Sequence, residues 1–339
     1  MANGSRLYVL NQYSWWAAGN GGAALLARTT RLREGSSFVT FRKVFQLDRY
    51  LKERAALVER ALAQVIPESA GSEARLLEAM GYSLLGGGKR LRPILALAAC
   101  EAVGGVPERA IGFACAVEMI HNYSLIHDDL PCMDNDDLRH GRPTNHRLYG
   151  EALATLAGDG LLTDAFRVLA CSASDGVPSA ILLRTIADLA AAAGSGGMVG
   201  GQVIDLQSEG APLSLDELKL LHAKKTGALF LASIVGGARI GGGSEPQLVN
   251  LDQYARALGL AFQVVDDLLD VEASTEQMGK RTGKDRAAGK ATFPSLLGLD
   301  KSWQFARRLE QEAREALSEF GVNADPLRAI ATFVVERKQ

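Results

Sequence analysis

Long apolar runs and a net charge are both missing from this sequence. Its apolar stretches, such as ILALAAC at 94–100, stop short of the ~18 to 20 residues that a membrane-spanning helix needs. Lysine and arginine number 37 against 39 aspartates and glutamates, a formal net charge of −2. Without a strong overall field, the chain is not suited to nucleic acid or to an anionic membrane surface. We therefore expect a soluble protein with no membrane span and no nucleic-acid partner.

Cysteines and strand patterns are also scarce. The cysteines form no CxxC pair and no zinc spacing, which favours reduced thiols in a cytoplasmic protein; they are Cys100, Cys115, Cys132 and Cys171. Alternation of apolar and polar residues, the mark of a half-buried strand, is nearly absent. These absences argue against a disulfide scaffold, a zinc module and a β-sheet protein.

Helical periodicity is present instead. From Phe45 onward, apolar residues recur every three or four positions, and the 36 glycines gather between the periodic stretches. An apolar fraction of 47% is enough for a sizeable core. We predict an all-α protein in which residues 45–339 form a single domain of about ten helices.

Residues 1–44 differ in composition from the rest. They hold six basic residues and one acid, Glu34. This arginine-bearing, acid-poor composition fits an organelle transit peptide, but it fits a mobile tail or a misassigned start equally well. We expect an N-terminal extension that is flexible and leave its role open.

One acidic cluster lies within an apolar helical stretch, FQVVDDLLD at 262–270. At ~100° per residue, Asp266 and Asp270 lie about 40° apart on one helix face, with Gln263 one turn earlier. Ionised carboxylates inside such a helix are costly unless cations compensate them. The cluster therefore predicts either buried lysine or arginine partners or a metal site.

A second cluster, HDDLPCMDNDD, occupies residues 127–137. The stretch before it is apolar and helical, and Pro131 should end that helix just after Asp129. Asp134 then returns through a turn. Carboxylates gathered at the end of a buried helix suit Mg²⁺, which takes a few protein oxygens and keeps its other positions for water or phosphate. A solvated acidic loop is the alternative, and the matching cluster at 266–270 argues against it.

Basic residues next to glycine or threonine complement these carboxylates. Such groups are what phosphate oxygens require; they are Lys89, Arg90, Arg92, Arg139, Arg142, Lys224, Lys225, Lys280, Arg281 and Lys284. Any one of them could be ordinary surface charge. With the two acidic clusters they predict a site for two diphosphates, one held through metal and one held directly by lysine and arginine.

Six linked motifs carry a family resemblance. GGGKRLRP, HDDLPCMDNDDLRHGRPTNH, GGQVIDL, KKTGALF, FQVVDDLLD and GK followed by KATFP resemble, in order and spacing, the trans-isoprenyl diphosphate synthases, most closely the bacterial farnesyl diphosphate synthases. The match runs from about Phe45 to the C-terminus. It implies the isoprenoid synthase bundle around a central active-site cavity, a homodimer, and Mg²⁺-dependent condensation of isopentenyl diphosphate with dimethylallyl or geranyl diphosphate to (2E,6E)-farnesyl diphosphate.

The resemblance also implies roles for individual residues. Asp128, Asp134 and Asp266 would hold three Mg²⁺ ions on the allylic diphosphate, with Asp129, Asp267 and Asp270 as further ligands or their support. The positions that match contacts to the allylic substrate are Arg139, Lys225, Thr226, Gln263 and Lys280. Those that match contacts to isopentenyl diphosphate are Lys89, Arg92 and His121. The residues that would carry out catalysis are Asp128, Asp129, Asp134, Asp266, Lys225 and Lys280.

One position departs from the family pattern. Where the family usually reads LRRG, this chain reads LRHG, which puts His140 in place of an arginine that binds isopentenyl diphosphate. A neutral imidazole offers one donor instead of a permanently charged fork. We expect weaker isopentenyl diphosphate binding with a pH-sensitive KM, and compensation by Arg142 or Arg90.

Product length depends on what lies below Asp128. Tyr123 precedes it by five residues, about 7.5 Å along a helix. An aromatic there resembles the bacterial farnesyl pattern and would stop the chain at 15 carbons; a C20 geranylgeranyl product is the alternative, and Tyr123 could simply be core. A terpene cyclase or a non-catalytic synthase subunit are further alternatives. A purely aspartate second motif and a cationic second-substrate site argue against both.

Overall fold

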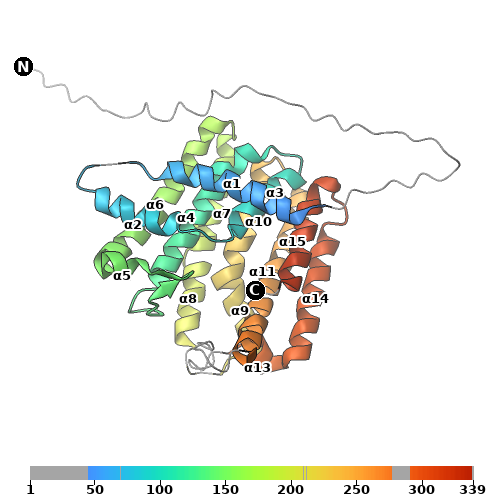
Figure 1. Cartoon of the computed structure of the whole chain (residues 1–339). Coiled ribbons are helices and arrows are strands. Elements are labelled where there is room, and N and C mark those ends of the chain that lie inside the picture. The colour runs from blue at the N-terminus through green and yellow to red at the C-terminus, as the bar shows by residue number, and fades with distance from the viewer. Residues whose placement is uncertain (1–44, 69, 209, 211, 277–290, 338–339) are drawn as a thin grey trace, which may run out of the picture. The chain divides into compact units, whose positions relative to one another are not determined.

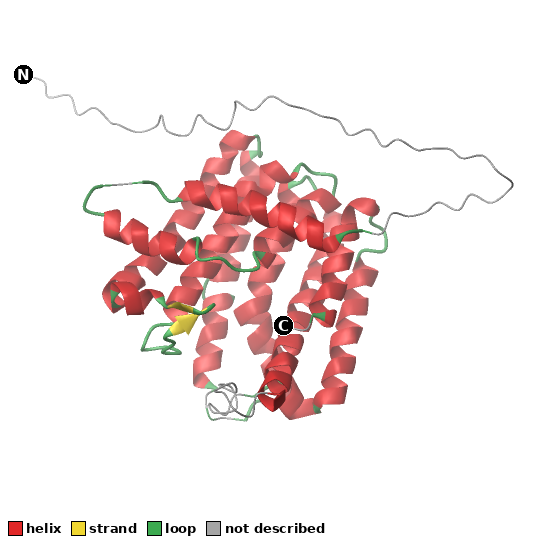
Figure 2. Cartoon of the chain, in the orientation of Figure 1, coloured by secondary structure: helices red, strands yellow, loops and turns green. Residues whose placement is uncertain are grey.

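The computed structural model describes residues 45–68, 70–208, 210, 212–276 and 291–337. Its first half contains α1 (Leu47–Val65), α2 (Ala74–Leu84), α3 (Leu91–Ala102), the 3₁₀ turn η2 (Pro107–Ala110), α4 (Ile111–Asp128), β1 (Leu138–Arg139), β2 (Arg142–Pro143), α5 (Asn145–Tyr149) and α6 (Glu151–Cys171). Figures 1 and 2 show that nearly all of these elements are helices.

The second half continues with η3 (Ser172–Asp175), α7 (Ser179–Ala193), α8 (Met198–Gln207), α9 (Leu215–His222), the π-helix η4 (Ala223–Gly227), α10 (Ala228–Ile240), α11 (Glu245–Glu276), α13 (Phe293–Leu297), α14 (Leu299–Ala316), η5 (Val322–Ala324) and α15 (Asp325–Glu336). The prediction of an all-α fold is confirmed. The described residues contain more than ten helices, because short ones such as α5 and α13 separate the long ones.

Two apolar clusters form the interior. One gathers the buried faces of α2, α4, α6 and α7, and the other those of α10, α11, α14 and α15. α3 contributes to both, with Leu97 in the first cluster and Leu95 in the second, and most of its residues are buried. It therefore joins the two halves of the bundle, and its all-round apolar sequence is typical of such a central helix.

Small residues let α3 and α10 approach closely. A Cβ added to Gly237 would lie 2.1 Å from the carbonyl oxygen of Ala96, and one added to Gly236 would lie 2.3 Å from the ring of Phe113. Neither helix can move apart without opening a gap in the core, because protein interiors are packed as densely as organic crystals. Gly237 is therefore a packing requirement rather than a flexible joint.

The sequence predicted the C-terminal end of α4 correctly and missed two local elements. α4 ends at Asp128, just before Pro131, as expected. The strands β1 and β2 pair antiparallel, Arg139 opposite Arg142, around a two-residue turn that the sequence analysis did not predict. The stretch 215–240 is not one helix, since η4 interrupts it. No described helix is long and apolar enough to cross a membrane.

Replacing Gly237 with alanine should destabilise the fold. The added methyl group meets backbone rather than a movable side chain, so we expect a loss of about 1 to 3 kcal/mol in the free energy of unfolding. Chemical denaturation measures it. Gly321→Ala is the matched control, because no atom lies within 4 Å of the added Cβ. Equal stability of the two variants would contradict the close packing of α3 on α10.

Candidate active site

Three adjoining cavities share residues and form one site. The hairpin pocket, of about 460 Å³, lies beside β1–β2. The carboxylate pocket, of about 810 Å³, is lined by Asp266, Asp270 and Arg337 among others, and the apolar pocket, of about 480 Å³, by Tyr123 and residues of α8. Lys89 and Arg139 line the first two pockets, and Lys225 lines the last two.

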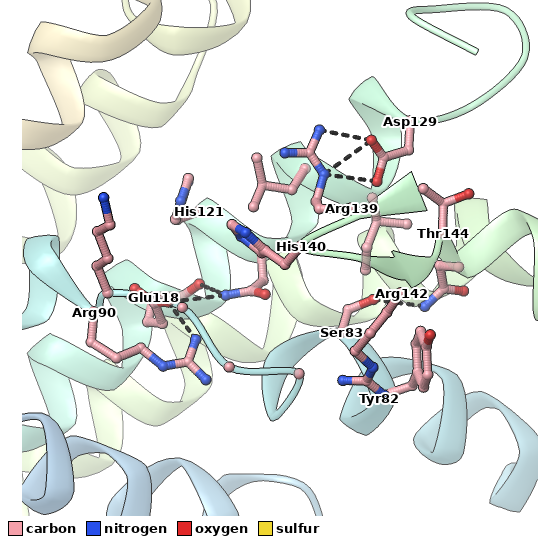
Figure 3. A pocket seen from close by; sticks show the side chains of 18 of the residues that line it. Tyr82, Ser83, Arg90, Glu118, His121, Asp129, Arg139, His140, Arg142 and Thr144 are labelled. Carbon is pink, nitrogen blue, oxygen red and sulfur yellow. Dashed lines mark hydrogen bonds and ion pairs between the residues drawn. The ribbon is translucent and has the colours of Figure 1, made fainter. Parts of the chain in front are cut away.

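The β1–β2 turn positions the cationic side chains that line the hairpin pocket. Its central residues, His140 and Gly141, have φ of 52° and 75°, which a type I′ hairpin turn requires. Arg139 donates three hydrogen bonds of 2.7 to 3.0 Å to both carboxylate oxygens of the buried Asp129. Figure 3 shows Arg139 reaching Asp129 on one side of the hairpin, Arg142 beside Tyr82 on the other, and His140 between them.

Arg90 anchors the glycine loop on the opposite side of this pocket. Its guanidinium is buried and donates to Glu59 (2.6 Å), to Glu118 (2.6 Å) and to the carbonyl oxygen of Leu84 (2.8 Å). The residue has φ of 48°, in the left-handed region. Each of its nitrogens already donates inside the protein, which makes Arg90 less suited than Arg142 to the predicted compensation for His140.

Arg92 and His121 face each other 3.1 Å apart, from Arg92 Nη1 to His121 Nε2. Burial lowers the pKa of His121 well below its usual value, with Arg92 acting in the same direction, so the imidazole is neutral and accepts the hydrogen bond. Burial also lowers the pKa of Arg92 to about 10. An incompletely neutralised guanidinium in a half-buried pocket is suited to an anion.

The face of α11 predicted from the spacing lines the carboxylate pocket, with Gln263, Asp266 and Asp270 all present. Arg337 donates to Asp266 (2.5 Å) and to the carbonyl oxygen of Phe262 (3.2 Å), and its guanidinium carbon lies 4.0 Å from the Phe262 ring centroid. Burial nevertheless raises the pKa of Asp266 to about 6, against the opposing effect of Arg337. Its side chain is 41% exposed, so it stays open to the pocket.

Asp128 closes α4 at the other wall of the site. Gln202 of α8 donates to Asp128 Oδ1 at 2.9 Å. The backbone N–H of Asp134 donates to the backbone carbonyl oxygen of Asp128 at 2.9 Å, which brings Asp134 back towards Asp128. Burial raises the pKa of Asp128 to about 6, and Asp134 adds to the shift while Lys225 opposes it. Asp128 is therefore a carboxylate short of positive charge.

The π-helix η4 presents Lys225 and Thr226 between the carboxylate and apolar pockets. Lys225 Nζ donates to Asp205 of α8 at 2.6 Å. A Cβ on Gly201 would lie 2.2 Å from the backbone nitrogen of Lys225, so only glycine lets α8 approach the π-turn. π-turns inside helices are often found at functional sites.

The donor set fits a hard divalent cation. Asp128 and Asp266 are partly buried carboxylates whose pKa values burial raises to about 6, and each has a like-charged neighbour, Asp134 or Asp270. No group of three acidic, histidine or cysteine ligands is close enough, among the described residues, to hold a metal alone. Mg²⁺ tolerates this, because it commonly takes one or two carboxylates and completes its shell with substrate phosphate and water.

The apolar pocket extends from Asp128 between α4 and α8. Val199, Val203 and Leu206 lie on one face of α8 and line it, and their 40 to 47% exposure reflects that open space. Tyr123 is buried in the α4 wall and packs edge-on against His127, with ring centroids 5.7 Å apart. His127 Nε2 lies 3.0 Å from the carbonyl oxygen of Thr155, as expected of a structural histidine.

Most predicted site residues line these pockets, and some were missed. The described ones are Lys89, Arg92, His121, Tyr123, Asp128, Asp129, Arg139, His140, Lys225, Thr226, Gln263 and Asp266. Lys280 and residues 1–44 lie outside the described residues. Asp267 accepts from the backbone N–H of Phe293 at 2.9 Å and anchors α13. Gln202, Asp205 and Arg337 were not predicted; the GGQVIDL motif contained a signal for the first two.

The unfavourable charge on Asp128 should make Asp128→Asn more stable than the parent in metal-free buffer. The raised pKa means that the folded state binds more protons than the unfolded state between about pH 4 and 6, so the ionised carboxylate costs stability above that range. Asparagine can still accept from Gln202. We expect about 1 kcal/mol at pH 7.5, or 2 to 4 °C in Tm, falling to zero near pH 4. A Tm difference independent of pH would contradict the charge argument.

Comparison with known proteins agrees with this site. The family profile described as "Polyprenyl synthetase" matches residues 73–320. The chain is 49% identical over 301 residues to "Heterodimeric geranylgeranyl pyrophosphate synthase large subunit 1, chloroplastic" from Arabidopsis thaliana, covering 87% of this chain and 80% of the relative. It is 49% identical to "Geranylgeranyl pyrophosphate synthase, chloroplastic" from Catharanthus roseus, covering 86% and 82%.

A solved structure described as an FPP/GFPP synthase from Zymomonas mobilis superposes with a TM-score of 0.77 at 42% identity, covering 85% of this chain and 98% of that one. Geranylgeranyl pyrophosphate synthetase from Pyrococcus horikoshii Ot3 gives 0.78 at 33%, covering 86% and 98%. The family profile alone covers the chain from the start of α2 to just beyond α14. The chain belongs to the polyprenyl synthetase family of prenyl-chain-elongating transferases.

Proposed function

We propose that this protein condenses isopentenyl diphosphate with allylic diphosphates and that its main product is geranylgeranyl diphosphate (C20). The observation that carries the condensation is the junction of the pockets. A cationic pocket, with Lys89, Arg92 and His121, opens into one lined by the carboxylates of α11. Joining two such substrates needs two adjacent sites. One site holds a diphosphate directly through cations, and the other holds a diphosphate through metal.

The chain's own residues divide the work. Asp128, Asp134 and Asp266 would hold Mg²⁺, which when bound neutralises the departing diphosphate and favours its loss as a leaving group. Lys225, Thr226, Gln263, Arg139 and, outside the described residues, Lys280 orient the allylic diphosphate. Lys89, Arg92 and His121 hold isopentenyl diphosphate so that its double bond faces the allylic carbon. Asp129 fixes Arg139 in place by their bidentate ion pair.

Developing positive charge on the allylic group needs an apolar wall that excludes water and offers no nucleophile. The side chains of Val199, Val203 and Leu206 supply that wall along α8. After the new carbon–carbon bond forms, a proton leaves the former isopentenyl unit, and the nearest strong acceptor is the released diphosphate. No side chain has to act as a nucleophile in this scheme, which agrees with the structural role of His127.

The relatives named above as geranylgeranyl pyrophosphate synthases support a C20 product. To make C20, the site must hold the 15-carbon farnesyl chain before the last addition. The apolar pocket, of about 480 Å³, is the place for that chain, because it lies directly beside Asp128.

A C15 product is the second candidate, and Tyr123 is the observation that favours it. The ring is in the pocket wall five residues before Asp128, where its bulk would limit the length of the chain. Its edge-on contact with His127 is a local α4 contact, which draws the ring towards its own helix. Whether the ring stands in the path of the growing chain decides between the two products.

We further propose that residues 45–339 form the catalytic domain, that the protein acts as a homodimer in the cytoplasm, and that residues 1–44 are dispensable for catalysis. One relative is named a heterodimeric large subunit, so a hetero-oligomer is the alternative assembly. The relatives named chloroplastic make targeting by residues 1–44 the alternative role for that extension. Light scattering and a variant lacking residues 1–44 test these points.

Alanine at Asp128 or Asp266 should reduce condensation by at least about 100-fold, because each removes a carboxylate placed to hold the metal on the diphosphate. Diphosphate release, measured with Mg²⁺ and both substrates, reports the loss, and circular dichroism verifies the fold. Asp137→Ala is the matched control, since Asp137 belongs to the same acidic stretch and pairs only with exposed Arg147 in the described residues. Retained turnover in both variants would overturn the metal assignment.

Product length should be C20 for the parent protein and longer for Tyr123→Ala, because removing the ring deepens the pocket. Chromatography of products from labelled isopentenyl diphosphate and dimethylallyl diphosphate with Mg²⁺ measures it. Tyr149→Ala is the control, since Tyr149 lies on α5 and lines none of the three pockets. A C15 product from the parent would favour the second candidate, and an unchanged product from Tyr123→Ala would show that another residue limits the chain.

A further inference from the structure

The hairpin pocket contains cations in two different situations. Arg90 forms ion pairs with Glu59 and Glu118, and Arg139 forms one with Asp129. Arg142 has no carboxylate partner among the described residues. Its guanidinium instead stacks on Tyr82, with its carbon 4.2 Å from the ring centroid, and lines the pocket.

The hairpin places Arg142 in an unfavourable position unless an anion is present. The register puts Arg142 directly opposite Arg139, and like charges opposite each other across a β-ladder are destabilising. The ion pair with Asp129 compensates the charge of Arg139. Arg142 has only the aromatic face, which stabilises a cation without neutralising it.

Arg142 is nevertheless held in position. Tyr82 donates through its hydroxyl to the carbonyl oxygen of Pro143 at 2.8 Å, so the same side chain stacks on Arg142 and ties its strand to α2. A Cβ on Gly86 would lie 2.9 Å from Arg142 Nη1. The guanidinium thus rests against the glycine loop that leads to Lys89, and Gly86 is the residue that leaves room for it.

We propose that Arg142 is a ligand of the isopentenyl diphosphate and supplies the guanidinium that His140 does not. The inference rests on the proposed function, because it assigns a residue to one of that reaction's two substrates. A guanidinium gives the diphosphate two parallel donors and a permanent charge. His140, which is exposed in a turn that requires positive φ, then need not bind the diphosphate.

The test measures binding of isopentenyl diphosphate alone to the full-length protein by calorimetry in metal-free buffer, together with steady-state kinetics. Arg142→Leu should weaken binding and raise the KM for isopentenyl diphosphate by about 10- to 50-fold, as expected for losing charge-assisted hydrogen bonds. The kcat and the KM for the allylic substrate should stay within about twofold. Arg75→Leu is the matched control, because Arg75 also stacks on a tyrosine, Tyr149, outside the pocket.

A rescue variant makes the test specific. His140→Arg, introduced into the Arg142→Leu protein, should recover most of the lost affinity, since it restores a guanidinium two residues away in the same turn. Unchanged binding in Arg142→Leu, while Lys89→Ala binds poorly, would overturn the assignment of Arg142 and leave the proposed function intact. No binding and no condensation by the folded parent protein would instead overturn the proposed function, and the inference with it.

Discussion

The ion pair between Arg90 and Glu118 is the interaction on which the site's geometry depends. Glu118 is buried in the middle of α4, and without Arg90 its charge would be uncompensated there. The same guanidinium binds Glu59 of α1 and the last turn of α2. Three helices and the glycine loop are thereby fixed to one group. Lys89 and Arg92 lie one and two residues from Arg90 in the sequence. Because Arg90 is fixed, the backbone that carries these two side chains beside the pocket is fixed as well.

Charge compensation explains the rest of the cavity. Asp129, Asp205 and Asp266 each have an internal cation, namely Arg139, Lys225 and Arg337. Such pairs compensate charge inside a helical bundle, where an isolated buried charge is costly. Within the described part of the chain, Asp128 has no ion-pair partner and accepts from the amide of Gln202 instead. Substrate and metal would therefore enter a site in which most charges are already paired and must be shared or exchanged.

Much of the fold could be predicted from the sequence, because helical periodicity and Pro131 act locally. The common face of Asp266 and Asp270 likewise follows from helix geometry alone. The partners of those carboxylates could not be predicted. Arg337 reaches Asp266 from the position just after α15, 71 residues further along the chain. The β1–β2 turn was missed because His140 is a less familiar occupant of a positive-φ position than asparagine or glycine. The internal ion pairs of Arg90 could not be predicted either, because burial of its side chain is not visible in the sequence.

The π-helix η4 has a consequence for the lengths that this part of the chain can take. α9 packs against α8 and α13, whereas α10 packs against α3, so each side of η4 has its own fixed rotation. The wider turn absorbs the mismatch between the two, and an α-turn in its place would need one residue fewer. Deleting a residue between Ala223 and Gly227 would therefore give a more regular helix but rotate Lys225 by about 100° relative to one of its neighbours. The packing on both sides therefore fixes the length of this segment, whereas an exposed loop tolerates insertions and deletions.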